Sequence, residues 1–153
     1  MAGRLKPELK RALKAVLQTE HAISSVCGTR IYDMAIPRVS AKGGATKDYP
    51  QITFSIDSNG AALGLPVESF AAQINIWVET HVKEPKTTAD RLELAIRDLL
   101  HGAVGQTGVT TLNAQSSTLK CRLCRLDSSL ELPEPDNNLL RTSMTFTVVL
   151  GTT

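Results

Sequence analysis

The sequence predicts an α/β fold of the α+β type, a largely antiparallel sheet with two helices packed on one face. Two segments, one near the start of the chain and one in its middle, carry apolar residues at helical spacing. Several others alternate apolar and polar residues as strands do. Strands that follow one another through loops usually pair antiparallel, and two amphipathic helices are enough to cover one face of their sheet.

Length and composition indicate a soluble protein with no obligatory charged partner. The 153 residues fit one domain, residues 1 to 153, that can bury its own core. The 17 basic and 15 acidic residues give a formal charge of +2, which is too mild to require nucleic acid or an anionic membrane. No segment resembles a signal peptide or a membrane span, and three irregularly spaced cysteines suit reduced thiols. We therefore expect a cytosolic protein without disulfides.

The first organised segment, from about Lys6 to Ser24, is predicted to be an amphipathic helix. Its apolar residues recur at helical spacing, while Lys6, Lys10 and Lys14 follow one another at four-residue steps along another face. These lysines could face DNA or another anion. The alternative, a solvated helix face, is favoured because no aromatic residue accompanies them for base stacking.

Two strands are predicted next, at Arg30 to Ile36 and at Gln51 to Asp57, each bounded by a proline. The connection between them, "RVSAKGGATKD", is much longer than a hairpin needs, and such loops are either disordered or functional. Its candidate docking residues are Arg38, Lys42, Lys47 and Asp48.

A second long connection, "SNGAALGLPV" from Ser58 to Val67, begins with a turn signal but continues with apolar residues. Leu63 and Leu65 either fold back over the protein's own core or dock into a partner, and the sequence leaves both open. The following stretch "ESFAAQINIWVET" alternates from Glu68 to Thr80, which predicts one long strand.

The second helix is predicted around "RLELAIRDLL", with a capping box formed by Thr87 and Asp90 at its start and Gly102 at its end. Beyond it, "VTTLNA" is predicted to be a weak strand, "LKCRLCRLDSSLEL" a bent strand and "RTSMTFTVVL" the last strand. The exposed acidic loop "PEPDNN" lies between the last two strands, and Glu134 and Asp136 are its docking candidates.

The second face of the predicted sheet has an unusual composition. In a half-buried sheet the solvent face normally carries lysine and glutamate, but here the side chains that point away from the core are small, hydroxylic or amide-bearing. Such a surface can be buried against another polypeptide at little desolvation cost, although the chain's own loops could cover it instead. The candidate subunit-interface residues are Thr53, Ser55, Gln73, Asn75, Trp77, Thr145 and Thr147.

Catalytic and metal-binding patterns are absent from the sequence, so no enzyme activity and no cofactor is expected. Cys121 and Cys124 resemble a redox or zinc pair, but residues three apart in a strand should point to opposite faces. The three histidines stand in unrelated contexts, and no nucleophile elbow or phosphate-binding glycine loop is present. Besides the first helix, a DNA-binding surface could use Lys120, Arg122 and Arg125.

The assembled pattern resembles a known group. A leading helix, "GTRIYDMAIP", a long polar loop, "YPQITFSID", the strand ending "INIWVET", the helix "RLELAIRDLL" and the strand "TSMTFTVVL" are similar, over most of the chain, to the tail-terminator (tail-completion) proteins of long-tailed bacteriophages. The resemblance implies a non-enzymatic virion protein that is assembled in the host cytoplasm.

In that family the protein forms a hexameric ring on the tail tube, stops tube polymerisation and docks to the neck. The implied partners are therefore further copies of the chain, the tail tube protein, neck or connector proteins, and DNA passing through the lumen. A head-completion or stopper protein of the neck, and a small DNA-binding protein with a basic helix face, remain the alternatives. No membrane partner is expected.

Overall fold

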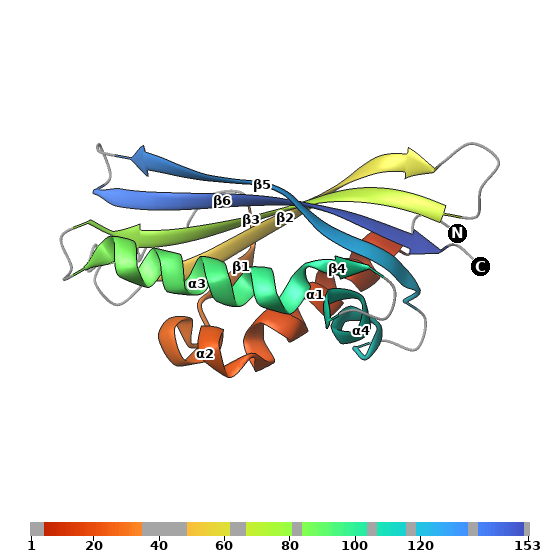
Figure 1. Cartoon of the computed structure of the whole chain (residues 1–153), viewed down its shortest axis with the longest axis horizontal. Helices are drawn as coiled ribbons and strands as arrows, with labels where there is room; N and C mark the ends of the chain where they lie inside the picture. Colours follow the sequence, from red (N-terminus) through yellow and green to blue (C-terminus); the bar gives the residue numbers. More distant parts are fainter. Residues whose placement is uncertain are drawn as a thin grey trace.

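The computed structural model describes residues 5–34, 49–61, 67–80, 84–103, 107–115, 119–134 and 138–151. These residues form two layers, a twisted sheet and a layer of helices on one of its faces (Figure 1). The elements in chain order are α1 (Leu5–Thr19), α2 (His21–Cys27), β1 (Ile31–Asp33), β2 (Gln51–Ala61), β3 (Val67–Glu79), α3 (Pro85–Leu100), β4 (Gly102–Ala103), α4 (Thr107–Asn113), β5 (Cys121–Glu134) and β6 (Leu139–Gly151).

The sheet has the strand order β1-β2-β3-β6-β5-β4, and every neighbouring pair is antiparallel except β1 and β2. The predicted largely antiparallel sheet is therefore confirmed. The two central strands, β3 and β6, pair without interruption from Val67 opposite Gly151 to Glu79 opposite Leu139. The peptide bond between Tyr49 and Pro50, where the chain enters β2, is cis.

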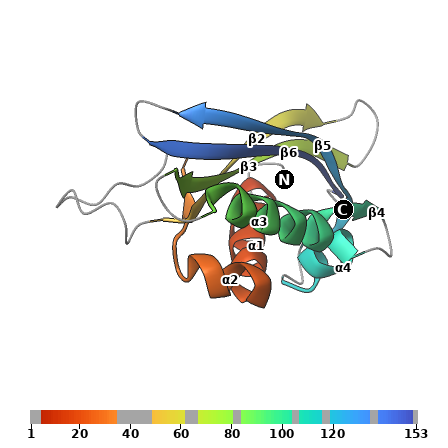
Figure 2. The same cartoon turned by 60° about the vertical axis from the view of Figure 1, so that its left-hand side comes forward.

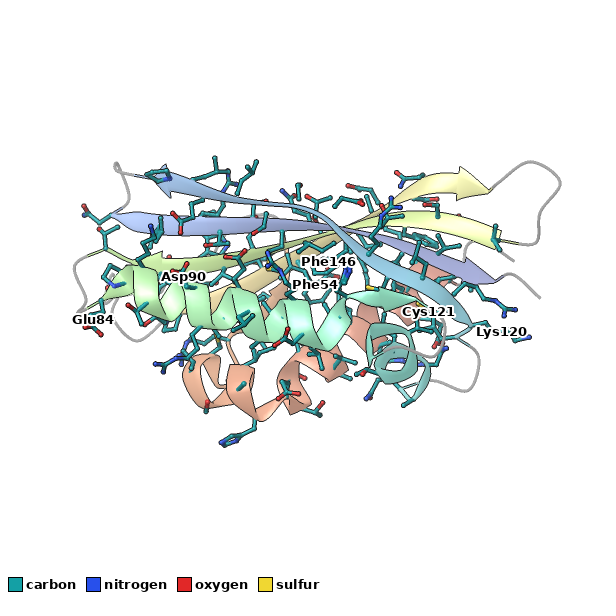
Figure 3. The ribbon with its side chains drawn as sticks, viewed as in Figure 1. Phe54, Glu84, Asp90, Lys120, Cys121 and Phe146 are labelled. Atoms are coloured by element: carbon teal, nitrogen blue, oxygen red, sulfur yellow. The ribbon has the colours of Figure 1, made fainter. Side chains whose placement is uncertain are left out.

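The hydrophobic core lies between the helices and one face of the sheet, which we call the inner face. Figure 2 shows the helices gathered on this one side. Phe54, Phe70 and Phe146 reach the core from three neighbouring strands and are at most 1% exposed, and Figure 3 shows Phe54 and Phe146 near the middle of the sheet, behind α3. Leu9 of α1 and Leu92 and Ile96 of α3 belong to the same core and are also at most 1% exposed. Burial of each such side chain contributes about 1.5–3 kcal/mol.

The helix layer differs from the prediction in number. The described residues contain four helices rather than two, and the single helix expected from Lys6 to Ser24 is divided into α1 and α2. The division falls at Glu20, whose ψ of 117° is extended rather than helical. Just before it, the Thr19 hydroxyl donates a hydrogen bond back to the Ala15 carbonyl at 2.9 Å, as hydroxyl side chains often do near helix ends.

Two further helix predictions are wrong in detail. The segment "VTTLNA" is not a strand, because residues up to Asn113 belong to α4, where Val109 and Leu112 stand three positions apart and are both buried. Helix α3 begins at Pro85 after Glu84 and has no side-chain cap, so the capping box predicted at Thr87 does not form. Pro85 explains the earlier start, since proline suits the first turn of a helix.

The strands also run longer than predicted at several ends. Strand β2 continues through Ser58 to Ala61, so the first part of "SNGAALGLPV" is strand rather than loop. By contrast, β1 has only three residues, Ile31–Asp33. Strand β5, which the sequence predicts to be bent, contains two irregularities of register, of the kind that bend a strand.

Candidate interaction surface

The candidate surface is the outer face of the sheet, opposite the helices. The register places its side chains in rows that cross β2, β3, β6 and β5 in that order. The first row is Ser55, Gln73, Thr145 and Ser128, and the second is Thr53, Asn75, Ser143 and Leu130. All seven interface candidates named from the sequence lie on this face, five of them in these two rows and the other two, Trp77 and Thr147, in flanking positions.

One part of the outer face is already buried within the chain. Thr53, Asn75 and Trp77 are 0%, 1% and 4% exposed. The Trp77 indole N–H donates a hydrogen bond to the Thr53 hydroxyl at 2.9 Å, and the Arg141 guanidinium lies 5.4 Å from the centre of the indole ring. These three candidates therefore contribute to the stability of the subunit, whatever else they contact.

The accessible part of the outer face includes the row of Ser55, Gln73, Thr145 and Ser128, together with Thr147. We call this set the outer row. Gln73 donates a hydrogen bond to the Ser143 hydroxyl at 3.0 Å, which links the first row to the second. Beside the outer row lies Leu130, which is 59% exposed.

Charged residues border the outer row. The shorter strands predicted from the sequence suggested a face without charge, but the face carries charges at both ends. Next to Thr147, Arg125 pairs with Asp127 at 2.8 Å, and the Thr147 hydroxyl also donates to the Asp127 carboxylate. The hydrogen bond from Thr147, together with Arg125, lowers the pKa of the Asp127 carboxyl. Glu79 and Arg141 lie at the other end. The outer row itself has no ionisable side chain.

The candidate DNA-facing cations do not form one open surface. On α1, Lys10 forms an ion pair with Asp33 at 3.2 Å, which interrupts the row of Lys6, Lys10 and Lys14. On β5, Arg125 is paired with Asp127, whereas Lys120 and Arg122 are exposed and have no ion pair among the described residues.

The cysteine pair corrects one sequence prediction. Cys121 and Cys124 both face the core and are 3% and 1% exposed, because the extra residue of a bulge between Cys121 and Leu123 shifts the alternation. Burial raises the pKa of Cys121 to about 11 and that of Cys124 further. Cys27 is also buried, with a pKa raised to about 12. These thiols stay protonated near neutral pH, so they lack the thiolate that redox and metal chemistry require.

Within the described part of the chain, no three or more His, Cys, Asp or Glu residues are grouped so that they could hold a metal ion. A hollow of about 230 Å³ between the α1–α2 junction and α3 is lined by Glu20, Ala22, Ala95, Asp98 and Leu99. It is smaller than typical small-molecule sites of ~300–1,000 Å³. Across the described residues, no helix is both long enough and apolar enough to span a membrane.

The docking-loop candidates cannot be placed in this arrangement. Arg38, Lys42, Lys47, Asp48, Leu63, Leu65 and Asp136 lie outside the described residues. Glu134 is the last residue of β5, and only its backbone position is described.

Comparison of the sequence with known protein families finds no match, and comparison with curated proteins finds none either. Comparison of the fold with solved structures does find a match. One similar chain belongs to a structure described as the virion of a native gene transfer agent particle. The alignment covers 98% of this chain and 96% of that chain, with a TM-score of 0.66 and 14% sequence identity. The fold of this chain is therefore similar to that of one component of this virion structure.

Proposed function

We propose that the chain is a tail terminator, a structural virion protein that forms a ring at the head-proximal end of a tail tube, ends tube polymerisation and joins the tail to the neck. The fold likeness supports a virion role because it extends over nearly the whole of both chains. The sequence resemblance to tail terminators adds the more specific assignment and implies six copies in the ring.

The observation that carries the proposal is the outer row. Ser55, Gln73, Thr145 and Thr147 form an accessible, uncharged strip in the middle of a sheet whose opposite face is fully packed. Interfaces are depleted of charge at their centres and carry polar groups at the rim. The outer row with Leu130 beside it and the pair of Arg125 and Asp127 at its border has this arrangement. We therefore assign it to contact with another polypeptide, a neighbouring copy of this chain.

The other proposed partners follow from the position of such a ring. One side would meet the tail tube protein, the other would meet neck or connector proteins, and DNA would pass through the lumen. Assembly would take place in the host cytoplasm and the finished protein would reside in the virion. A purely structural role is consistent with buried, protonated thiols and with the small size of the hollow beside α3.

Two other functions remain as alternatives. A head-completion or stopper protein of the neck would share the ring and the virion location, and it would differ in joining the head before the tail. A DNA-binding role is less well supported, because Lys10 and Arg125 are each neutralised by an aspartate.

The test is the mass of the purified protein, alone and mixed with the tail tube protein of the same particle, together with electron microscopy of the mixture. We expect a ring that caps one end of the tubes and limits their length. Tubes that grow equally long with and without the protein would contradict a terminator. Steeply salt-dependent DNA binding by a monomer would favour the DNA-binding alternative instead.

A further inference from the structure

A ring places a geometric requirement on its subunit. When the same patch of two copies meets itself, the contact is two-fold and closes at a dimer, whereas a ring needs two different surfaces that fit each other. The outer row alone cannot supply both. The following inference rests on the proposed ring and concerns which further surfaces of the subunit meet.

One end of the sheet carries two exposed cations on a backbone that is held in place. Lys120 and Arg122 flank Cys121, whose backbone is held by the Asn113 side chain of α4. The Asn113 carbonyl oxygen accepts the Cys121 N–H at 2.7 Å, and its amide donates to the Cys121 carbonyl at 3.2 Å. With Cys121 facing the core, both neighbours are exposed. We call Lys120 and Arg122 the basic end.

The position of the basic end is fixed from the other side by β6. The Gly151 N–H donates to the Lys120 carbonyl at 2.8 Å. A Cβ built at Gly151 would lie 3.4 Å from Nε of Arg122, so the side chain of Arg122 runs beside the backbone of β6. Neither cation forms an ion pair within the described residues, so their charges are available to a partner.

The opposite end of the molecule carries exposed carboxylates. Glu84 immediately precedes α3 and Asp90 stands in its second turn, both exposed and without an ion pair in the part of the chain that the structure describes. Figure 3 shows Glu84 and Lys120 at opposite ends of the long axis, with Asp90 on the Glu84 side. We call Glu84 and Asp90 the acidic end.

Among the described residues, the cations near the acidic end form no ion pair with it. Lys86 is engaged with Glu131 at 3.9 Å. Arg91 is adjacent to Asp90 in the helix, and consecutive helical residues point in directions about 100° apart. Both carboxylates are exposed and therefore remain available to a partner.

The two charged ends are too far apart to interact within one subunit. Strand β5 spans 14 residues, which at about 3.3 Å per residue separates its ends by roughly 45 Å. The Debye length at physiological salt is only about 8 Å. We propose that the basic end of one copy docks against the acidic end of the next, and that this head-to-tail contact gives the ring its direction.

A second copy fits these ends better than nucleic acid does. Two cations provide few of the phosphate contacts that a DNA-binding surface commonly makes, and no exposed aromatic residue among the described positions stands beside them. The complementary charges, by contrast, are present on the same subunit, so every copy carries both halves of the contact.

The test is a charge swap in the full-length protein. The variant Lys120→Glu/Arg122→Glu has two acidic ends, and the variant Glu84→Lys/Asp90→Lys has two basic ends. We expect each alone to stay monomeric, as measured by light scattering behind a sizing column. An equimolar mixture should regain a ring of wild-type mass, because alternating the two variants makes every contact complementary in a ring with an even number of subunits.

The matched controls are Lys14→Glu and Asp98→Lys, which reverse exposed charges on the helices away from both ends and should leave the ring intact. Circular dichroism must show that all variants fold. Full assembly by either swapped variant alone, or no recovery in the mixture, would overturn the head-to-tail contact while leaving the terminator proposal standing. A wild-type protein that stays monomeric with and without tube protein would overturn both.

Discussion

The hydrogen bond between Trp77 and Thr53 offers a quantitative test of the buried part of the outer face. Replacing Thr53 by valine keeps the shape of the side chain but removes the acceptor of the Trp77 indole N–H. With Trp77 4% and Thr53 0% exposed, water cannot take the place of the hydroxyl without rearrangement. A buried donor left without a partner costs about 1–3 kcal/mol. We expect the free energy of unfolding to fall by this amount.

The assay is urea unfolding followed by the fluorescence of Trp77, which is the single tryptophan of the chain. With a denaturant slope of about 2 kcal/mol/M, a loss of about 2 kcal/mol lowers the midpoint by about 1 M. The matched control is Thr53→Ser, which keeps the hydroxyl and loses one methyl group, at a cost of about 0.8 kcal/mol. Trp77→Phe in both backgrounds completes a double-mutant cycle that isolates the hydrogen bond, with unfolding of all four proteins followed by circular dichroism because the Phe variants lack the tryptophan.

The reasoning would be refuted if Thr53→Val were as stable as the wild type and more stable than Thr53→Ser. That result would mean that the indole N–H of Trp77 finds another acceptor, or that it is exposed to water in solution. The assignment of Thr53 and Trp77 to the stability of the subunit would then fail.

Three further predictions concern other residues of the subunit. Thr145→Lys, at a partly buried position of the outer row, should abolish the oligomer and leave the thermal melt of the subunit nearly unchanged. Asn75→Glu, at a 1% exposed position, should instead unfold the subunit itself. Equal behaviour of the two variants in light scattering and circular dichroism would contradict this distinction. Burial raises the pKa of Cys121 to about 11 and that of Cys27 to about 12 from 9.0, so the stability that the protonated thiols contribute is complete below about pH 9 and is lost as pH rises toward these values. Cys121→Ala should weaken this pH dependence of the free energy of unfolding, measured by urea titrations at pH 8 and pH 10.5. An unaltered pH dependence would argue against this contribution of Cys121. Asn113→Ala leaves the Cys121 N–H without its 2.7 Å acceptor and should lower the free energy of unfolding by about 1–3 kcal/mol, with loss of hydrogen-exchange protection at that amide as the direct measure.

The strands were the most predictable part of the fold. Alternation from Glu68 to Thr80 places Phe70, Ile74 and Ile76 on one side, and all three are fully buried in the core. The same alternation correctly assigns Gln73 to the opposite face, and the alternation of the last strand does so for Thr145. A period of two follows from the geometry of the strand itself, so it can be read without knowing the neighbouring strands.

The features that the sequence did not predict depend on tertiary contacts. The bulge that brings Cys121 and Cys124 to the same side is set by pairing with β6, and no glycine marks it. Helix α4 is too short to show a periodic pattern, and Asn113 gains its role only through the backbone of Cys121.

The same limit applies to the candidate surface. Asn75 and Gln73 look alike in the alternating pattern, yet Asn75 is buried and Gln73 is partly accessible. Leu130 and Asp127 were not singled out, because the bulge after Leu126 changes which residues of β5 reach the outer face. Only the register across four strands reveals the outer row as one surface.

The central claim, that this protein ends the growth of a tail tube, is tested most directly by measuring tail lengths in particles produced without it. If the account is right, electron microscopy will show tubes of variable and excessive length that are not joined to heads, and supplying the wild-type chain will restore uniform joined tails. Supplying Thr145→Lys should fail to restore them. Tails of normal, uniform length in the absence of the protein would contradict the claim, and if such tails were unattached, the protein would be a head-completion or stopper protein of the neck instead.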